Sequence, residues 1–305
     1  MYRILSLFDC PLKDVKRLLP IIKEQGFNVV QVSPLQRNKT DNTDEWWLLY
    51  QPLGFDIGNK IGTKEELYDL CQEARRYGIH IIVDTVINHV ANKNEKEYLE
   101  PHPDSDKELL SNRDCFKEKK QITDWDDRKQ VINYCLGLPG LNPNNPIVQR
   151  KIINMLNEYV DLGVDGFRFD AAKSIALPEE GCNFFPTVNY SLKRWLPLIY
   201  GEVLFADEKL IKKYAKYMKV LTNSNSTDKD SIIKFIENKD SFLSKDLGWT
   251  KNWTKERVTN EYMILATNYP NTLYYARNYT DDWYEWQSRE VKEANKKLVK
   301  KIENK

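Results

Sequence analysis

The sequence predicts an α/β protein in which eight parallel strands and their helices form a (β/α)8 TIM barrel. Apolar runs of strand length alternate with segments of helical spacing, as in parallel α/β folds. Three of these runs are followed by a carboxylate, at Asp170, Glu202 and Asp240, and the ends of barrel strands converge on one face. The 305 residues of the chain suit a barrel of about 250 residues that carries one insertion.

The first 90 residues show the alternation most clearly. Thr63 and Glu66 form the sequence signature of a capping box, which predicts the start of a helix. The run 79–86 is apolar almost throughout, which is typical of a strand buried on both faces. The elements expected here are strands at 2–8, 29–33 and 79–86, a helix at 13–25 behind Pro11, and a helix at 63–77.

Residues 91–145 interrupt the pattern. They are rich in charge, Asn, Pro and Asp, with little periodicity, which predicts an insertion that projects from the barrel after its third strand. The barrel is therefore expected to comprise residues 1–90 and 146–305, with 91–145 as a small inserted domain between them.

Strand and helix patterns resume after the insertion. The expected strands are 166–170, 198–201, 219–222, 232–237 and 272–276, and the expected helices are 147–162, 207–217, 255–267 and 282–303. Only eight residues separate Thr222 from Ser231, whereas a parallel crossover usually needs about a dozen or more and a helix. We therefore expect the helix after the sixth strand to be missing and replaced by a polar loop.

Composition excludes several classes of partner. Lys and Arg total 46 against 45 Asp and Glu, so the net charge of +1 favours neither nucleic acid nor an anionic membrane. The chain has no signal-peptide pattern and no run of 18 apolar residues, and its five cysteines are scattered. We expect reduced thiols and a cytoplasmic protein, unless a secreted form was trimmed. The sequence carries no signal for an oligomeric state.

Two polar motifs follow predicted strands. The run 84–89 places Asp84, Asn88 and His89 at the end of the third strand, although a polar turn would read the same way. Arg168 and Asp170 are two residues apart on a strand, so both point into one barrel mouth, where the guanidinium would keep Asp170 ionised. Taken alone, such an ion pair is more often structural. Acids gathered at a barrel mouth are typical of glycosidic-bond chemistry.

Together these motifs resemble the signatures of the alpha-amylase family, glycoside hydrolase family 13. Segments 84–89, 166–173, 201–203 and 235–240 resemble its first to fourth signatures, and 46–52 resembles an aromatic and amide segment after its second strand. The resemblance covers essentially the whole chain, with the motifs in the family's order.

The resemblance implies roles for individual residues. Asp170 is the expected nucleophile, Glu202 the general acid and then base, and Asp240 the carboxylate that holds sugar hydroxyls and stabilises the transition state. The expected substrate-binding residues are Tyr50, Gln51, Asp84, His89, Arg168, Lys173 and Lys239, with Tyr50 stacking on the sugar. At least one of Trp46 and Trp47 is expected to pack in the core instead.

Three positions depart from the family pattern. Lys239 stands where the family has His before its catalytic Asp, and it either enters the pocket or points to solvent. Ser174 replaces the His of a Lys-His pair, and Gly140 replaces an Asp that ligates calcium. Asn88 and the Ser174 carbonyl remain as metal ligands, so we expect calcium binding to be weak. The family's C-terminal β-sandwich is not expected.

The resemblance implies cleavage of α-1,4-glucosidic bonds in starch, glycogen or maltodextrin by a retaining mechanism. A 4-α-glucanotransferase would share the glycosyl intermediate, so it remains an alternative. A degenerate, non-catalytic glucan-binding homologue is the second alternative. The loss of the His before Asp240, of the calcium-ligating Asp and of a barrel helix favours it, and the intact acids and Arg168 oppose it.

Overall fold

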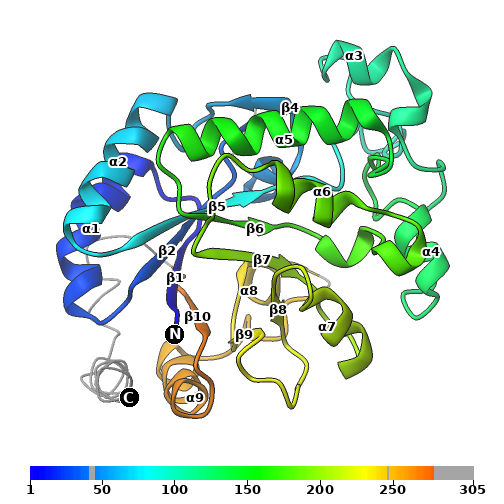
Figure 1. Ribbon diagram of the computed structural model, residues 1–305. Helices are drawn as coiled ribbons and strands as arrows, with labels where there is room; N and C mark the ends of the chain where they lie inside the picture. The colour runs from blue at the N-terminus through cyan, green and yellow to red at the C-terminus, as the bar shows by residue number, and fades with distance from the viewer. Residues whose placement is uncertain (41–44, 246, 278–305) are drawn as a thin grey trace.

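The computed structural model describes residues 1–40, 45–245 and 247–277, and within them eight parallel strands close into a barrel (Figure 1). The strand order around the barrel is β1-β10-β9-β8-β7-β6-β5-β2. The strands are β1 (Arg3–Leu7), β2 (Val29–Val32), β5 (His80–Thr85), β6 (Gly166–Phe169), β7 (Leu198–Glu202), β8 (Lys219–Thr222), β9 (Ile232–Phe235) and β10 (Thr272–Tyr275). The predicted barrel is confirmed.

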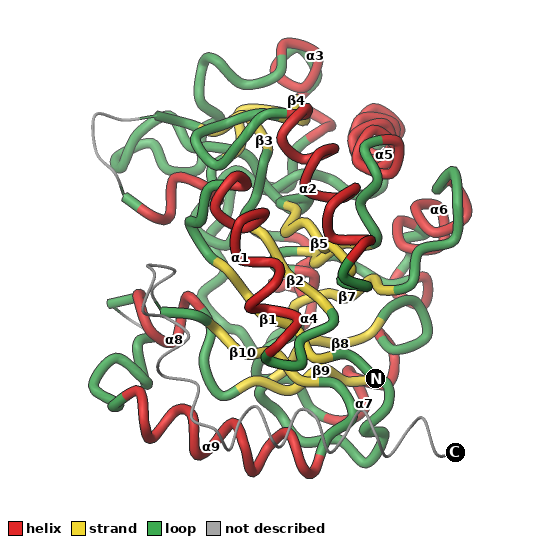
Figure 2. The backbone as a smooth tube through the Cα atoms, turned by 90° about the vertical axis from the view of Figure 1, so that its left-hand side faces the viewer, coloured by secondary structure: helices red, strands yellow, loops and turns green. Residues whose placement is uncertain are grey.

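Helices surround the strands, with α5 and α9 on opposite sides of the barrel (Figures 1 and 2). They are α1 (Leu12–Glu24), α2 (Lys64–Arg76), α5 (Pro146–Asp161), α6 (Phe184–Ser191), α7 (Glu208–Tyr214), α8 (Lys239–Leu243) and α9 (Lys255–Asn268). The capping box of α2 is confirmed, because the Glu66 N–H donates to Thr63 and the Thr63 N–H donates to Glu66. No helix in the described part of the chain has the length and apolar character needed to cross a membrane.

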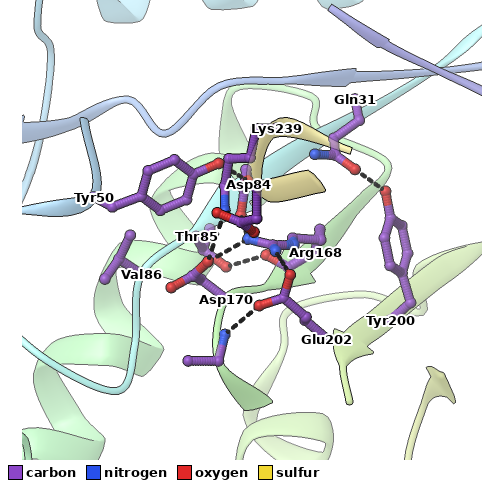
Figure 3. Close-up of polar contacts among 12 residues, drawn as sticks. Gln31, Tyr50, Asp84, Thr85, Val86, Arg168, Asp170, Tyr200, Glu202 and Lys239 are labelled. Carbon is purple, nitrogen blue, oxygen red and sulfur yellow. Dashed lines mark hydrogen bonds and ion pairs between the residues drawn. The ribbon is translucent and has the colours of Figure 1, made fainter. Parts of the chain in front are cut away.

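Alternate residues of the strands fill the barrel interior, and the others pack against the helices. The interior cluster consists of Ile4, Val29, Ile82, Leu198, Tyr200, Leu221, Ile233, Phe235, Leu273 and Tyr275. Tyr200 also donates a hydrogen bond of 2.6 Å to Gln31 across the interior (Figure 3). Burial on both faces explains why the strands read as continuous apolar runs.

The segment between β5 and α5 lies over the carboxyl ends of the strands (Figure 1). It contains α3 (Lys107–Leu110), the 3-10 turn η2 (Arg113–Cys115) and α4 (Arg128–Asn133). Isolated backbone bridges within it pair His89 with Gly140 and Phe116 with Leu141. The division of the chain at 91–145 into a separate domain remains a prediction.

The loop between β8 and β9 contains no helix across residues 223–231, as predicted. The two strands still pair in parallel. Lys234 secures the short connection, because its Nζ donates to the carbonyl oxygens of Asn223 and Ser224 at 2.7 and 2.9 Å.

Several elements differ from the expectation. A small antiparallel sheet, β3 (Gln36–Asn38) and β4 (Pro52–Ile57), flanks the 3-10 turn η1 (Trp46–Tyr50), and none of the three was predicted. The strand expected at 232–237 ends at Phe235. Asp240 therefore lies in the first turn of α8, not at a strand end as we expected. The helix expected at 282–303 lies outside the described residues.

Candidate active site

A cleft of about 770 Å³ opens at the carboxyl ends of the barrel strands. Its lining includes eight of the residues expected at the site: Tyr50, Gln51, His89, Asp170, Lys173, Glu202, Lys239 and Asp240. Asp84 and Arg168 lie buried beneath it, and Arg168 contacts both Asp84 and Asp170. The structure therefore brings the expected catalytic and substrate-binding residues together, whereas Asn88 points elsewhere.

Arg168 links three carboxyl groups from three neighbouring strand ends (Figure 3). Its Nη1 donates to Asp84 at 2.7 Å and to Asp170 at 2.5 Å, and its Nη2 donates to Glu202. Asp84 belongs to β5, Arg168 to β6 and Glu202 to β7, while Asp170 directly follows β6. The period-two argument that placed Arg168 and Asp170 on the same side is thus supported by a direct contact.

The backbone beside these acids is tightly constrained. Ala171, directly after Asp170, adopts a left-handed conformation with φ 48° and ψ 33°, and its N–H donates to Glu202 at 3.3 Å. A Cβ at Gly201 would lie 2.7 Å from the Cβ of Ala172, so only glycine lets β7 approach the turn η3 (Ala172–Ser174) this closely. Both features hold Glu202 beside Asp170.

Asp170 and Glu202 have pKa values that move in opposite directions. Burial alone would raise the pKa of Asp170, but the charges of Arg168 and Lys239 outweigh it and lower that pKa below its usual value. For Glu202, burial dominates over Arg168 and Lys239, and the pKa is raised. A protonated Glu202 still accepts the Arg168 bond through its carbonyl oxygen. Such a pair suits one ionised and one protonated carboxyl.

Tyr50 and His89 form a second polar group in the cleft. The Tyr50 hydroxyl donates to Asp84 at 2.7 Å, and burial raises the pKa of Tyr50 well above its ordinary value. His89 Nε2 donates to the Tyr50 carbonyl oxygen at 2.9 Å, and burial lowers the pKa of His89. In a neutral ring Nδ1 is then an acceptor, and among the described residues it is buried without a partner.

Lys239 enters the cleft and does not point to solvent. Its Nζ lies 2.8 Å from Asp240, 3.9 Å from Asp170 and 4.1 Å from the centre of the Tyr50 ring. Burial alone would lower its pKa, but nearby carboxylates led by Asp240 raise it, so the side chain carries a full positive charge. A cation therefore stands where the family pattern has an imidazole.

The expected calcium ligands contact a lysine. Lys117 Nζ, from the inserted segment, donates to Asn88 Oδ1 at 3.0 Å and to the Ser174 carbonyl oxygen at 2.6 Å. No cluster of three or more His, Cys, Asp or Glu side chains within the described ranges is arranged to hold a metal ion. The residues present therefore do not fit a calcium ion between these two oxygens.

Sequence reasoning missed several residues of the cleft. Trp125 and Phe205 line it and remain 50% and 57% exposed, and Leu136, Leu138 and Leu247 also contribute. Trp125 is an isolated aromatic residue in a polar segment, which is the signal that would have found it. Trp46 packs edge-on against Tyr50 and against the core but also lines the cleft, and Trp47 is exposed in the cleft. The expectation that one tryptophan packs in the core instead of contacting sugar stays a prediction.

Sequence comparisons identify relatives of the chain. The family described as "Alpha amylase, catalytic domain" matches residues 11–305. An alpha-amylase of Clostridium acetobutylicum is 39% identical over 230 residues, which cover 71% of this chain and 30% of that protein. An alpha-amylase-related protein of Drosophila auraria is 35% identical over 182 residues, which cover 57% of this chain and 37% of that protein. The chain thus spans about a third of the length of these relatives.

Solved structures share the fold. An alpha-amylase of Geobacillus thermoleovorans, complexed with acarbose, superposes with a TM-score of 0.74 at 20% identity, covering 97% of this chain and 78% of that one. Alpha-amylase I of Eisenia fetida superposes with a TM-score of 0.74 at 17% identity, covering 96% and 77%. At these identities the comparison establishes the architecture alone.

The buried Arg168 predicts a pH-dependent stability. In Arg168→Met, Asp84, Asp170 and Glu202 lose their shared cation, so burial raises their folded pKa values above the unfolded ones. The stability of this variant is then greatest at low pH and is lost as pH rises through the raised pKa values. At neutral pH the free energy of unfolding of the variant should be lower than that of wild type by about 3–5 kcal/mol. This difference should shrink as the pH is lowered to about 4, which thermal melts would measure.

The control is Arg37→Met, which removes an exposed arginine paired with Asp56. Its melting temperature should change little at any pH. If Arg168→Met lowers the stability by the same amount at all pH values, the role assigned to Arg168 is contradicted.

Proposed function

The chain belongs to the alpha-amylase family, and we propose that it is a retaining glycosidase that cleaves α-1,4-glucosidic bonds in starch, glycogen or maltodextrin. One observation carries the proposal. Asp170 and Glu202 share the guanidinium of Arg168, and their environments lower the pKa of Asp170 and raise that of Glu202. Retaining glycosidases need one ionised and one protonated carboxyl on opposite sides of the scissile bond.

In the first step, a carboxylate oxygen of Asp170 attacks the anomeric carbon of the bound glucosyl unit. The bond to the glycosidic oxygen breaks, and that oxygen takes the proton of Glu202 as the leaving chain departs. Arg168 holds both carboxyls in place and helps keep Asp170 ionised.

In the second step, the ionised Glu202 takes a proton from water as the water oxygen attacks the anomeric carbon. The ester bond to Asp170 breaks and returns Asp170 as a carboxylate, and Glu202 is protonated again. Net retention follows from two inversions. Attack by a sugar hydroxyl in place of water would give transfer instead of hydrolysis.

The cleft walls fit a chain of neutral sugars. Trp47, Trp125 and Phe205 present exposed aromatic surface on which the apolar faces of pyranose rings can stack. Asp240, held by Lys239, offers carboxylate oxygens to sugar hydroxyls. Gln51 and Lys173 supply further polar groups at the wall.

Incubation with maltoheptaose, followed by chromatography of the products, tests this proposal. Shorter maltooligosaccharides alone support hydrolysis. Products longer than the substrate would instead indicate a glucanotransferase. Unchanged substrate together with measurable binding would indicate a non-catalytic glucan-binding protein, and either of the last two results would overturn the proposal.

We expect Asp170→Asn and Glu202→Gln each to lower the turnover number by roughly a hundredfold to ten-thousandfold or more, because each removes a covalent or proton-transfer role. A 2-deoxy-2-fluoro glycosyl donor should label Asp170, as mass spectrometry of the digested protein would detect. Asp161→Asn, a surface change on α5, is the control and should retain full activity. A label on any other acid would contradict the assignment of the nucleophile.

Lys239 should shift the pH profile of the reaction. The profile of kcat/KM rises as Asp170 ionises and falls as Glu202 loses its proton. Because the Lys239 charge lowers the pKa of both groups, Lys239→Met should move both limbs to higher pH. Lys64→Met, which removes a lysine that pairs with Glu158 outside the cleft, should leave both limbs in place. Limbs that stay fixed or move to lower pH in Lys239→Met would contradict this electrostatic role.

A further inference from the structure

Lys117 ties three separate segments together beneath the cleft. It belongs to the inserted segment, is only 6% exposed, and its Nζ donates to Asn88, which follows β5, and to Ser174, in η3 after β6. Asn88 is next to His89, and Ser174 is four residues after Asp170. The lysine therefore contacts both loops that carry these cleft residues.

Lys117 binds Asn88 Oδ1 and the Ser174 carbonyl oxygen, the two oxygens that the family resemblance predicts as calcium ligands. A calcium ion lies about 2.3–2.6 Å from each of six to eight oxygens. The amine lies 2.6 and 3.0 Å from these two oxygens, so it occupies the volume that such an ion would need. Both acceptors are uncharged, so they supply none of the carboxylate charge that strengthens calcium binding.

Gly140 makes room for the lysine. A Cβ at this position would lie 2.9 Å from Cδ of Lys117 and 3.3 Å from its Cγ. The backbone N–H of Lys117 also donates to the Gly140 carbonyl oxygen at 2.8 Å, which fixes the two residues side by side. An aspartate at position 140 would thus compete with the stem of Lys117, so the lysine and the missing carboxylate are alternatives.

We propose that Lys117 is a built-in replacement for a structural metal ion, a positioning residue that fixes the inserted segment to the loops bearing His89 and Asp170. The native protein then needs no divalent cation at this place. This inference concerns the assembly of the cleft and does not depend on which reaction the cleft performs.

The link holds in either protonation state of the lysine. Burial lowers the pKa of Lys117 to about 7, but a neutral amine still has two N–H groups and an ammonium has three. Two oxygens require two donors. The hydrogen bonds, and not the charge, connect the three segments.

The first experiment uses the wild-type protein and two variants in thermal melts, with calcium chloride or with a chelator. Wild-type Tm should be the same in both. Lys117→Met keeps a stem of similar length but leaves two buried oxygens without their donor, so its Tm should fall by roughly 2–10 °C. Lys64→Met, the surface control, should melt like wild type. A wild-type Tm that falls with chelator, or an unchanged Tm in Lys117→Met, would overturn the proposal.

The second experiment exchanges the lysine for the metal. In Lys117→Ala combined with Gly140→Asp, the cavity left by the lysine faces a new carboxylate, Asn88 and the Ser174 carbonyl. Its Tm should rise with calcium concentration, as linkage requires for an ion bound only by the native state, whereas Lys117→Ala alone should not respond. No response in the double variant would contradict the assignment of this position to the metal.

A kinetic measurement separates positioning from bulk stability. Well below its Tm, Lys117→Met should raise KM for maltoheptaose more than it lowers kcat, because Lys117 bonds to the loops around the cleft and to none of the reacting carboxyl groups. Equal kcat and KM values for Lys117→Met and wild type would contradict the positioning role of the lysine. The melting experiments need no activity, so failure of the proposed reaction would leave them interpretable.

Discussion

The buried guanidinium of Arg168 is the interaction on which the rest of the site depends. A charge removed from water is costly unless it is paired and hydrogen-bonded, and here three carboxyl groups supply that compensation. Each comes from a different place at the strand ends: β5, the residue after β6, and β7. Closure of the barrel in the correct register is therefore coupled to assembly of the acids.

A single guanidinium does not compensate the charge of three buried carboxylates. The surroundings of each carboxyl group therefore determine whether its pKa is raised or lowered. Asp170 is nearest to additional positive charge, from Lys239 at 3.9 Å, and its pKa is lowered. Burial dominates for Asp84 and Glu202, whose pKa values are raised. Lys239 belongs to this balance as a second cation, so the departure from the family's histidine changes the electrostatics of the cleft as well as its hydrogen bonds.

Relations between residues close together in the sequence could be predicted from the sequence alone, whereas contacts between residues far apart in the sequence could not. Period two placed Arg168 and Asp170 together, and the spacing of Thr63 and Glu66 located the start of α2, because both relations are local. Asp240 was assigned to a strand end, although β9 stops at Phe235 and a helix supplies the residue. Lys117 was missed because its partners are 29 and 57 residues away, in a segment without periodicity. Gly140 in the sequence indicated a missing metal ligand, but only the structure shows that the side chain of Lys117 occupies that space.

A titration of the individual carboxyl groups tests the central claim most directly. Carbon-13 NMR of protein labelled at the side-chain carboxyls of Asp and Glu, with Asp170→Asn and Glu202→Gln spectra for assignment, follows each group separately. The account predicts that Glu202 titrates above, and Asp170 below, the pKa of the same residue in an unfolded chain. A Glu202 carboxyl that ionises before Asp170 would contradict it.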